Sequence, residues 1–242
     1  MDRAGVNWHV SPDQFALAWA RTDGDRIPYP LAVRASARDT LERAAQQPAL
    51  DAWCATTLDA DLSAALRVLA KPEIRVEVRG QAGGQVRMLG AVTGDVAVLA
   101  VQAPGTAEDR GGPVHVQVGS TKRFAAQVFT RMPAHPIGTG PALSAPVARV
   151  REDSRDLVTA PVAGPSEAAR VRKLLQRPRC GIGQILVGAG ADEAPTGVLS
   201  WIDVTGDGRY LVHAARHVDI TPATPQSATD WLRRLLRNAS GG

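Results

Sequence analysis

Polar and apolar residues alternate along two stretches of the chain, and each stretch contains four short runs with the two-residue period of a half-buried β-strand. Tight turns connect the runs, so we expect those of each stretch to pair as antiparallel strands. The first four runs are EIRVEVRG, QVRMLGAV, VAVLAVQA and VHVQV, and the second four are CGIGQILVG, TGVLSWIDV, GRYLVHAA and HVDIT.

Segments with the three- and four-residue spacing of amphipathic helices flank both sets of runs. The helix before each set ends at a proline, which cannot continue it. The last helix begins with Thr224 as a predicted N-cap and Pro225 at its first position, where a missing N–H costs nothing. The four predicted helices cover residues 62–72, 120–132, 166–178 and 224–238.

The two sets resemble copies of one unit. The tripeptide TGD occurs at residues 93–95 and again at residues 205–207, and prolines and valines in the two halves keep a similar offset. Small differences in that offset are expected from hairpin loops of different length. We therefore predict an α+β fold, in which an antiparallel β-sheet with flanking helices is built from two quasi-two-fold-related helix–four-strand–helix repeats.

The N-terminal region lies outside the repeats. Ser11 and Gln14 have the spacing of a capping box at the start of a helix. The segment RIPYPLAV follows and is predicted as an extended, proline-punctuated strand. Residues 36–53 are predicted as a helical stretch that is interrupted near Pro48.

A proline-rich segment separates the two halves. Residues 132–153 are predicted to be an extended linker, because prolines recur along them. The N-terminal α/β half then covers residues 1–131, and the C-terminal α/β half covers residues 154–242. We expect the two halves together to form one compact domain.

The stretch WIDVTGDGRYLV resembles the first half of a calcium-binding loop. With Asp203 at position 1, Gly208 fits position 6, but position 12 is Ala214 instead of the required Glu. Strand-like sequence flanks the stretch, whereas the calcium motif needs a helix on each side. We therefore interpret TGDG as the turn of a β-hairpin, with Asp203 and Asp207 as solvated turn carboxylates.

No known catalytic motif is visible. The chain lacks a phosphate-binding loop and a nucleophile elbow, and GIGQILVG leads from a helix into a strand, the reverse of a dinucleotide-binding loop. His213 and His217 have the spacing of a helical metal pair but fall on neighbouring predicted strands. Cys54 and Cys180 lie far apart and suggest neither a disulfide framework nor a zinc site. We predict no catalytic residue, no metal site and no cofactor.

Composition narrows the function further. A hydrophobic content of 44% and a charged content of 21% are typical of soluble globular proteins. No membrane-spanning run and no signal peptide are apparent, so we expect a cytoplasmic protein. The pI near 9.6 invites a nucleic-acid partner, but the basic residues are spread along the chain and aromatic residues make up only 4%. We therefore expect no nucleic-acid partner.

Several motifs, in one order over roughly 210 residues, resemble the EspG family of actinobacterial type VII (ESX) secretion-associated proteins. The segment PYPL is followed by LRVLAKPEIRVEVRG and GAVTGDVAVLAV, and later by an R-x-G-x-G-Q segment and a W-x-D…G-R-Y pattern. We interpret the last pattern as serving the fold. The marked positions are Arg179, Gly181, Gly183, Gln184, Trp201, Asp203, Gly208, Arg209 and Tyr210.

The resemblance implies a cytosolic, non-enzymatic chaperone that binds a secreted PE–PPE heterodimer at the helical tip of its PPE protein, keeps it soluble and targets it for export. Such a task needs a broad surface with exposed apolar groups and a polar rim. Candidate surfaces are the outward side of the strands between Val76 and Leu89, the loop at residues 79–85, and the C-terminal helices. We expect a monomer or a homodimer. The predicted partner-binding residues are Arg75, Glu77, Arg79, Gln81, Gln85 and Arg87.

Two other classes of function are open to the same sequence. An enzyme or a small-ligand-binding protein on a duplicated α+β fold would show a closed pocket with convergent polar groups and shifted pKa values. A nucleic-acid-binding protein would bind any polynucleotide with a strong dependence on salt.

Overall fold

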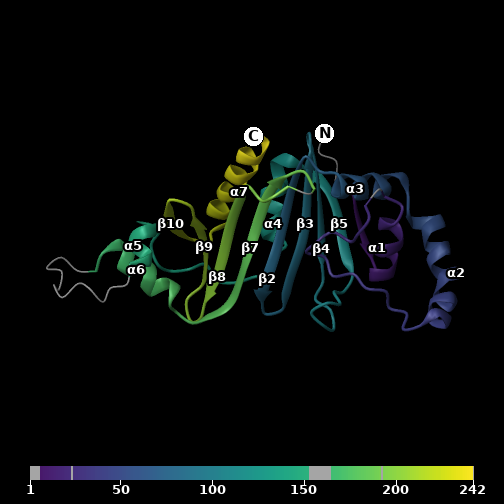
Figure 1. The fold of residues 1–242 in the computed structure, drawn as a ribbon, viewed down its shortest axis with the longest axis horizontal. Helices are drawn as coiled ribbons and strands as arrows, with labels where there is room; N and C mark the ends of the chain where they lie inside the picture. The colour runs from purple at the N-terminus through teal and green to yellow at the C-terminus, as the bar shows by residue number, and fades with distance from the viewer. Residues whose placement is uncertain (1–5, 23, 153–164, 192, 242) are drawn as a thin grey trace.

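Ten strands form one sheet in which every neighbouring pair is antiparallel, in the order β1-β5-β4-β3-β2-β7-β8-β9-β10-β6 (Figure 1). The computed structural model describes residues 6–22, 24–152, 165–191 and 193–241. The central pair, β2 and β7, joins the two halves of the chain. The strands are β1 (Asn7–Val10), β2 (Ile74–Ala82), β3 (Gln85–Thr93), β4 (Val96–Gln102), β5 (Val114–Ser120), β6 (Leu143–Pro146), β7 (Arg179–Ala189), β8 (Gly197–Val204), β9 (Arg209–Ala214) and β10 (His217–Pro222).

Helices cover the two faces of the sheet unequally. On one face, here called the closed face, α4 and α7 pack over the middle of the sheet. On the opposite, open face, α1 and α3 cover the end near β4 and β5, and α5 and α6 cover the end near β6 and β10. Figure 1 shows these two groups of helices at opposite ends, with β2, β7 and β8 between them. The helices are α1 (Pro12–Trp19), α2 (Thr40–Thr57), α3 (Ala60–Ala70), α4 (Thr121–Thr130), α5 (Val147–Arg151), α6 (Glu167–Leu175) and α7 (Pro225–Ser240).

The central strands alternate between the two faces. Along β2, Ile74, Val76 and Val78 are buried against the closed-face helices, whereas the residues between them face the open side. Burying one such aliphatic side chain contributes about 1.5–3 kcal/mol. The apolar period of β2 therefore holds the sheet against α4 and α7 and leaves polar side chains in the middle of the open face.

The structure confirms the α+β class and the eight expected strands, which are β2–β5 and β7–β10. The capping box of α1 is also present: Ser11 Oγ accepts the Gln14 N–H at 3.2 Å, and Gln14 Oε1 accepts the Ser11 N–H at 2.8 Å. Thr224 caps α7, and Pro225 occupies its first turn. Strands β1 and β6 were not expected, because four residues are too few for an alternation to stand out.

The prediction of a strand at RIPYPLAV was wrong. The segment has no strand pairing, because Pro28 and Pro30 lack the N–H groups that a ladder needs. The Tyr29–Pro30 bond is cis, and the Leu31 N–H donates to the Pro28 carbonyl across a turn. The buried Gln102 side chain then holds Ala32, accepting its N–H at 2.8 Å and donating to its carbonyl at 3.1 Å.

The predicted interruption near Pro48 was also wrong. Helix α2 runs through Pro48 without a break. Proline removes one helical hydrogen bond, the one to the carbonyl of Ala44. Both residues are exposed, so water can solvate that carbonyl and the helix continues.

The chain between α4 and β6, residues 131–142, crosses the β8–β9 hairpin and is called the crossing segment below. Ile137 forms an isolated parallel bridge with Arg209, and the Gly138 N–H donates to the Arg209 carbonyl at 3.0 Å. Strand β6 then pairs with β10, and α5 follows it. The described part of residues 132–153 thus contributes one strand and one short helix to the fold.

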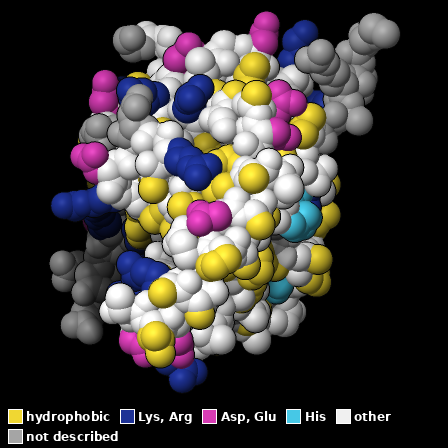
Figure 2. Space-filling model, turned by 90° about the vertical axis from the view of Figure 1, so that its right-hand side faces the viewer, with side chains coloured by type: hydrophobic (Ala, Val, Ile, Leu, Met, Phe, Trp, Pro, Cys, Tyr) yellow, Lys and Arg dark blue, Asp and Glu magenta, His cyan; other side chains and the backbone are white. Residues whose placement is uncertain are grey.

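The end of the molecule formed by α2 carries charges of both signs. Figure 2 shows Lys and Arg side chains interspersed with Asp and Glu side chains on this face, with scattered apolar groups between them. Such a face lacks the single-sign stripe that binds a polynucleotide backbone.

Within the described ranges, no helix has the length and hydropathy needed to cross a bilayer.

At the edge of the sheet, His9 on β1 stacks on His115 on β5, with ring centroids 4.2 Å apart. Burial lowers the pKa of His115 below 6.5, and the positive charges of Arg131 and His9 lower it further. In the unfolded chain the pKa returns towards 6.5, so below that pH the unfolded state binds more protons than the native state. We therefore expect the free energy of unfolding to fall as the pH drops through 6.5 towards the lower native pKa.

The measurement is urea unfolding at a series of pH values for the wild type and His115→Gln, with His217→Gln as the exposed control. His115→Gln should flatten this part of the pH dependence, and His217→Gln should not. Equal pH dependence in wild type and His115→Gln contradicts the assignment.

Candidate functional site

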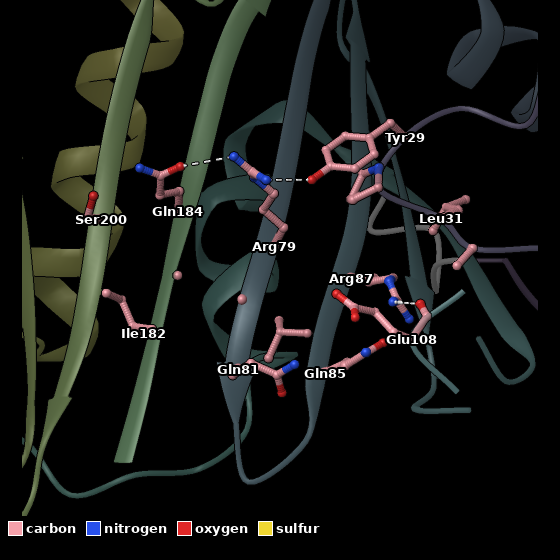
Figure 3. A pocket seen from close by; sticks show the side chains of 15 residues that line it. Tyr29, Leu31, Arg79, Gln81, Gln85, Arg87, Glu108, Ile182, Gln184 and Ser200 are labelled. Carbon is pink, nitrogen blue, oxygen red and sulfur yellow. Dashed lines mark hydrogen bonds between the residues drawn. The ribbon is translucent and has the colours of Figure 1, made fainter. Parts of the chain in front are cut away.

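The middle of the open face is a groove. Its volume is about 550 Å³, and its floor is formed by β2, β3, β7 and β8. The chain around the cis bond forms one wall, and the Tyr29 hydroxyl points towards Arg79 of β2 (Figure 3). The lining side chains used below are Tyr29, Arg79, Gln81, Gln85, Arg87, Glu108, Ile182, Gln184 and Ser200.

Strand register brings the lining residues together. Arg79 on β2 lies opposite Arg87 on β3 and opposite Gln184 on β7. One pleat further, Gln81 lies between Gln85 and Ile182 on the same two strands. Side chains two residues apart on a strand share a face, so these two rows form a continuous polar surface with one aliphatic side chain at its corner.

Four of the six predicted partner-binding residues line the groove, namely Arg79, Gln81, Gln85 and Arg87. Arg75 and Glu77 lie on the same side of β2, outside the groove lining, and form an ion pair with 2.7 Å between Arg75 Nε and Glu77 Oε1. Arg75 also donates to the Tyr29 carbonyl at 2.7 Å, which ties the wall to the floor. Which of these residues contact a partner stays a prediction.

Of the two other candidate surfaces, one lies beside the groove and the other lies on the opposite face of the sheet. The turn between β2 and β3 contains Gly83, whose φ of 67° suits glycine, and it connects the lining residues Gln81 and Gln85. The C-terminal helix α7 packs on the closed face, against β7 and β8. Helix α7 therefore contacts the strands of the groove floor on the side opposite the groove.

The charged side chains of the groove lining are Arg79, Arg87 and Glu108. Arg79 and Arg87 are cross-strand partners, and like charges placed directly opposite are destabilising. Both guanidinium groups donate to neutral acceptors: Arg79 to the Tyr29 hydroxyl at 2.8 Å and to Gln184 Oε1 at 3.4 Å, and Arg87 to the carbonyl of Glu108 (Figure 3). In the described part of the chain neither forms an ion pair, so both can receive an anionic group.

Apolar groups border the polar rows. Tyr29 is 51% exposed, Ile182 47% and Val198 38%, and each lies on or beside the open face. Sequence reasoning missed these residues. Ile182 and Val198 lie on strands of the second half, which was not among the candidate surfaces, and Tyr29 belongs to the segment that was wrongly predicted as a strand.

The W-x-D…G-R-Y pattern builds the β8–β9 hairpin. Gly206 has a φ of 73°, which confirms the turn. Asp203 is fully buried and binds Arg209, with 2.6 Å from Oδ1 to Nε and 2.9 Å from Oδ2 to Nη2. Trp201 and Tyr210 are fully buried as well. These contacts support our interpretation that the pattern serves the fold.

The prediction that Asp203 and Asp207 are solvated was wrong. Asp207 accepts the Thr139 N–H at 2.8 Å, the Thr139 hydroxyl at 2.9 Å and the Tyr210 hydroxyl at 2.9 Å. The Thr139 backbone N–H is the largest cause that holds the pKa of Asp207 far below its usual range. The Asp207 carboxylate thus links the crossing segment to the β8–β9 hairpin through Thr139. The two residues are far apart in sequence, so no local pattern predicts this contact.

The R-x-G-x-G-Q segment makes close packing possible. A Cβ on Gly183 would lie 2.0 Å from a ring carbon of Trp201 and 2.4 Å from the Arg79 carbonyl oxygen. A Cβ on Gly181 would lie 2.3 Å from Asp203 Oδ2. The glycines thus clear the closed face for Trp201 and Asp203, while Gln184 faces the groove beside Arg79.

The two histidines considered as a metal pair lie on β9 and β10. His213 stacks on Trp231 of α7, with ring centroids 4.7 Å apart. Among the described residues, no three His, Cys, Asp or Glu side chains are grouped as metal ligands.

A comparison with protein families matches residues 11–234 to the EspG family. A comparison with curated proteins gives no match. The matched range contains strands β2–β10, the groove and the hairpin pattern described above. This chain belongs to the EspG family, whose proteins are associated with type VII secretion.

Proposed function

We propose that this protein is a cytosolic chaperone of a type VII (ESX) secretion system, which binds a helical secreted client, keeps it soluble and targets it for export. Family membership supports the chaperone role. The client that fits best is a PE–PPE-type heterodimer. The protein acts without catalysis, cofactor or metal, as a monomer or a homodimer.

The open-face groove is the proposed client surface, and this observation carries the proposal. Four strands form its floor, and a spacing of about 4.8 Å between neighbouring strands makes the floor roughly 14 Å wide. A helix with its side chains is about 10–12 Å across, so the end of a helix fits between the flanking elements. The sheet supplies a rigid base, with α4 and α7 behind it.

The chemistry of the groove indicates what the client offers. Ile182, Val198 and Tyr29 provide apolar area that a helical tip can cover. Arg79 and Arg87 favour a carboxylate on the client, because both guanidinium groups donate only to neutral acceptors in the described part of the chain. We therefore propose a docking tip with apolar side chains next to an acidic residue.

We also propose that the sheet arose from a duplicated unit. The element order α3-β2-β3-β4-β5-α4 is followed later by α6-β7-β8-β9-β10-α7. An antiparallel pair such as β2 and β7 has a local two-fold axis between its strands, which is where the axis relating the halves belongs. Residues 1–131 and 154–242 are then the two halves of one compact domain, joined by residues 132–153.

Replacing Ile182 by serine should weaken client binding about tenfold, which corresponds to about 1.4 kcal/mol, because the client loses an apolar contact at the groove. Ile137→Ser is the matched control, since Ile137 is 46% exposed but lies outside the groove lining. Arg79→Glu should weaken binding to a similar extent by repelling the client carboxylate.

The measurement is co-expression of the tagged chain with PE–PPE pairs of the same genome, size-exclusion chromatography, and titration of the purified pair. Equal affinity of wild type, Ile182→Ser and Arg79→Glu rejects the groove as the client surface. Failure of the wild type to retain any such pair rejects the PE–PPE client itself.

A further inference from the structure

The two cysteines occupy opposite environments. Cys54 is buried in α2, whereas Cys180 is exposed at the start of β7. The register of β7 against β8 shifts here: Arg179 pairs with Val204 and Gly181 with Asp203, so Cys180 is the extra residue of a β-bulge. A bulge turns a side chain out of the regular alternation and re-aims it. Cys180 is thereby directed at the crossing segment.

The thiol has two neighbours at hydrogen-bond distance. Cys180 Sγ lies 3.5 Å from His135 Nε2 and 3.5 Å from the backbone carbonyl oxygen of Asp203, and His135 Nδ1 lies 3.9 Å from Oδ1 of the buried Asp203 side chain. The Nδ1 atom is also 3.3 Å from the Pro136 carbonyl oxygen. With its proton on Nδ1, facing these two oxygens, the imidazole leaves Nε2 free to accept the proton of the thiol.

Arg209 holds His135 in place from both sides. Its guanidinium donates to the Pro133 carbonyl at 2.9 Å, and its backbone N–H donates to the Pro136 carbonyl at 2.7 Å. The same guanidinium is fixed by the carboxylate of Asp203. Thiol, imidazole and carboxylate are therefore aligned by a buried ion pair and not by flexible surface contacts.

We propose that Cys180 is a reactive thiol, with His135 as its proton acceptor, and that it is a site of reversible mixed-disulfide formation with low-molecular-weight disulfides. In this step the Cys180 proton moves to His135 Nε2, and the thiolate attacks one sulfur of the disulfide. The Cys180 S–S bond forms while the original S–S bond breaks. The departing thiolate takes the proton from His135 and leaves as a thiol, so Cys180 is oxidised and the small disulfide is reduced.

This assignment does not depend on the chaperone role. Neither Cys180 nor His135 is among the residues that line the groove. Cys180 is an exposed residue, which gives a small disulfide access, and the neighbouring imidazole accepts the thiol proton to form the thiolate, which is the attacking species in thiol–disulfide exchange.

The intact chain, incubated with oxidised glutathione near neutral pH, should acquire one glutathione adduct by mass spectrometry, located at Cys180 by peptide mapping and removed by a reductant. Cys180→Ser should acquire none. His135→Gln should slow adduct formation about fivefold and move the half-maximal rate to higher pH, whereas the control His217→Gln should match the wild type. Equal rates and equal pH profiles for wild type and His135→Gln overturn the role of His135.

A second measurement needs no variant. An activated thiol in the native chain should react with oxidised glutathione about fivefold faster than the same thiol in urea-unfolded protein, where His135 is no longer beside it. A slower reaction in the native state overturns the proposal, as does an adduct that forms first at Cys54.

Discussion

Replacing Asp203 by asparagine should lower the free energy of unfolding by about 3–5 kcal/mol, the range found when one partner of a buried ion pair is removed. Asp203 is fully buried and Arg209 only 8% exposed, so the guanidinium would keep its charge without a counter-ion. The substitution would also destabilise the crossing segment, because the Arg209 guanidinium donates to the Pro133 carbonyl. Urea unfolding measures the loss.

The double variant Asp203→Asn/Arg209→Met gives a sharper test. If the loss in the single variant comes from the unpaired charge, removing the arginine as well should recover part of it, and the two effects should fall short of additivity by about 1–3 kcal/mol. Asp230→Asn on the exposed surface of α7 is the matched control, expected to change stability by no more than about 0.5 kcal/mol. Strict additivity would show that the two side chains are not coupled.

Gly183→Ala should destabilise the protein by about 3 kcal/mol, at the upper end of the usual cost of overpacking. The added methyl group meets Trp201 on one side and the backbone of β2 on the other, and the backbone cannot rotate away. Gly84→Ala is the matched control, because its Cβ would approach no atom closer than 3.6 Å. Thermal unfolding compares the two. Equal transition temperatures would mean that the sheet accommodates the methyl group and that Gly183 is not required for close packing.

Local sequence patterns predicted much of the fold correctly. Alternation along β2–β5 and β7–β10 identified the strands, and capping chemistry at Ser11 and Thr224 located two helix starts. These features depend on residues within one turn or one hairpin. The predictions made from Pro28 and Pro48 were wrong, because the effect of a proline depends on whether the neighbouring N–H and C=O groups have other hydrogen-bond partners.

The candidate site was less accessible from the sequence. The polar positions of β2 were visible as the outward side of a strand, which is why Arg79 and Gln81 were named. Ile182 and Gln184, which lie opposite them, belong to β7. Nothing in the sequence of β2 or β7 predicts that these two strands are paired. The burial of Asp203 and the approach of His135 to Cys180 likewise depend on a crossing segment from another part of the chain.

The seam between β2 and β7 has a consequence for how the protein is made. The paired residues are about a hundred positions apart in sequence, so the ribosome completes β2 long before β7 emerges. During that interval β2 is an unprotected strand edge, open to pairing with other nascent chains. The groove floor also lacks its second half until β7 docks. If the groove binds a client as proposed, capture is confined to the finished chain. A premature stop before residue 179 yields a fragment with an open strand edge and half of the groove floor.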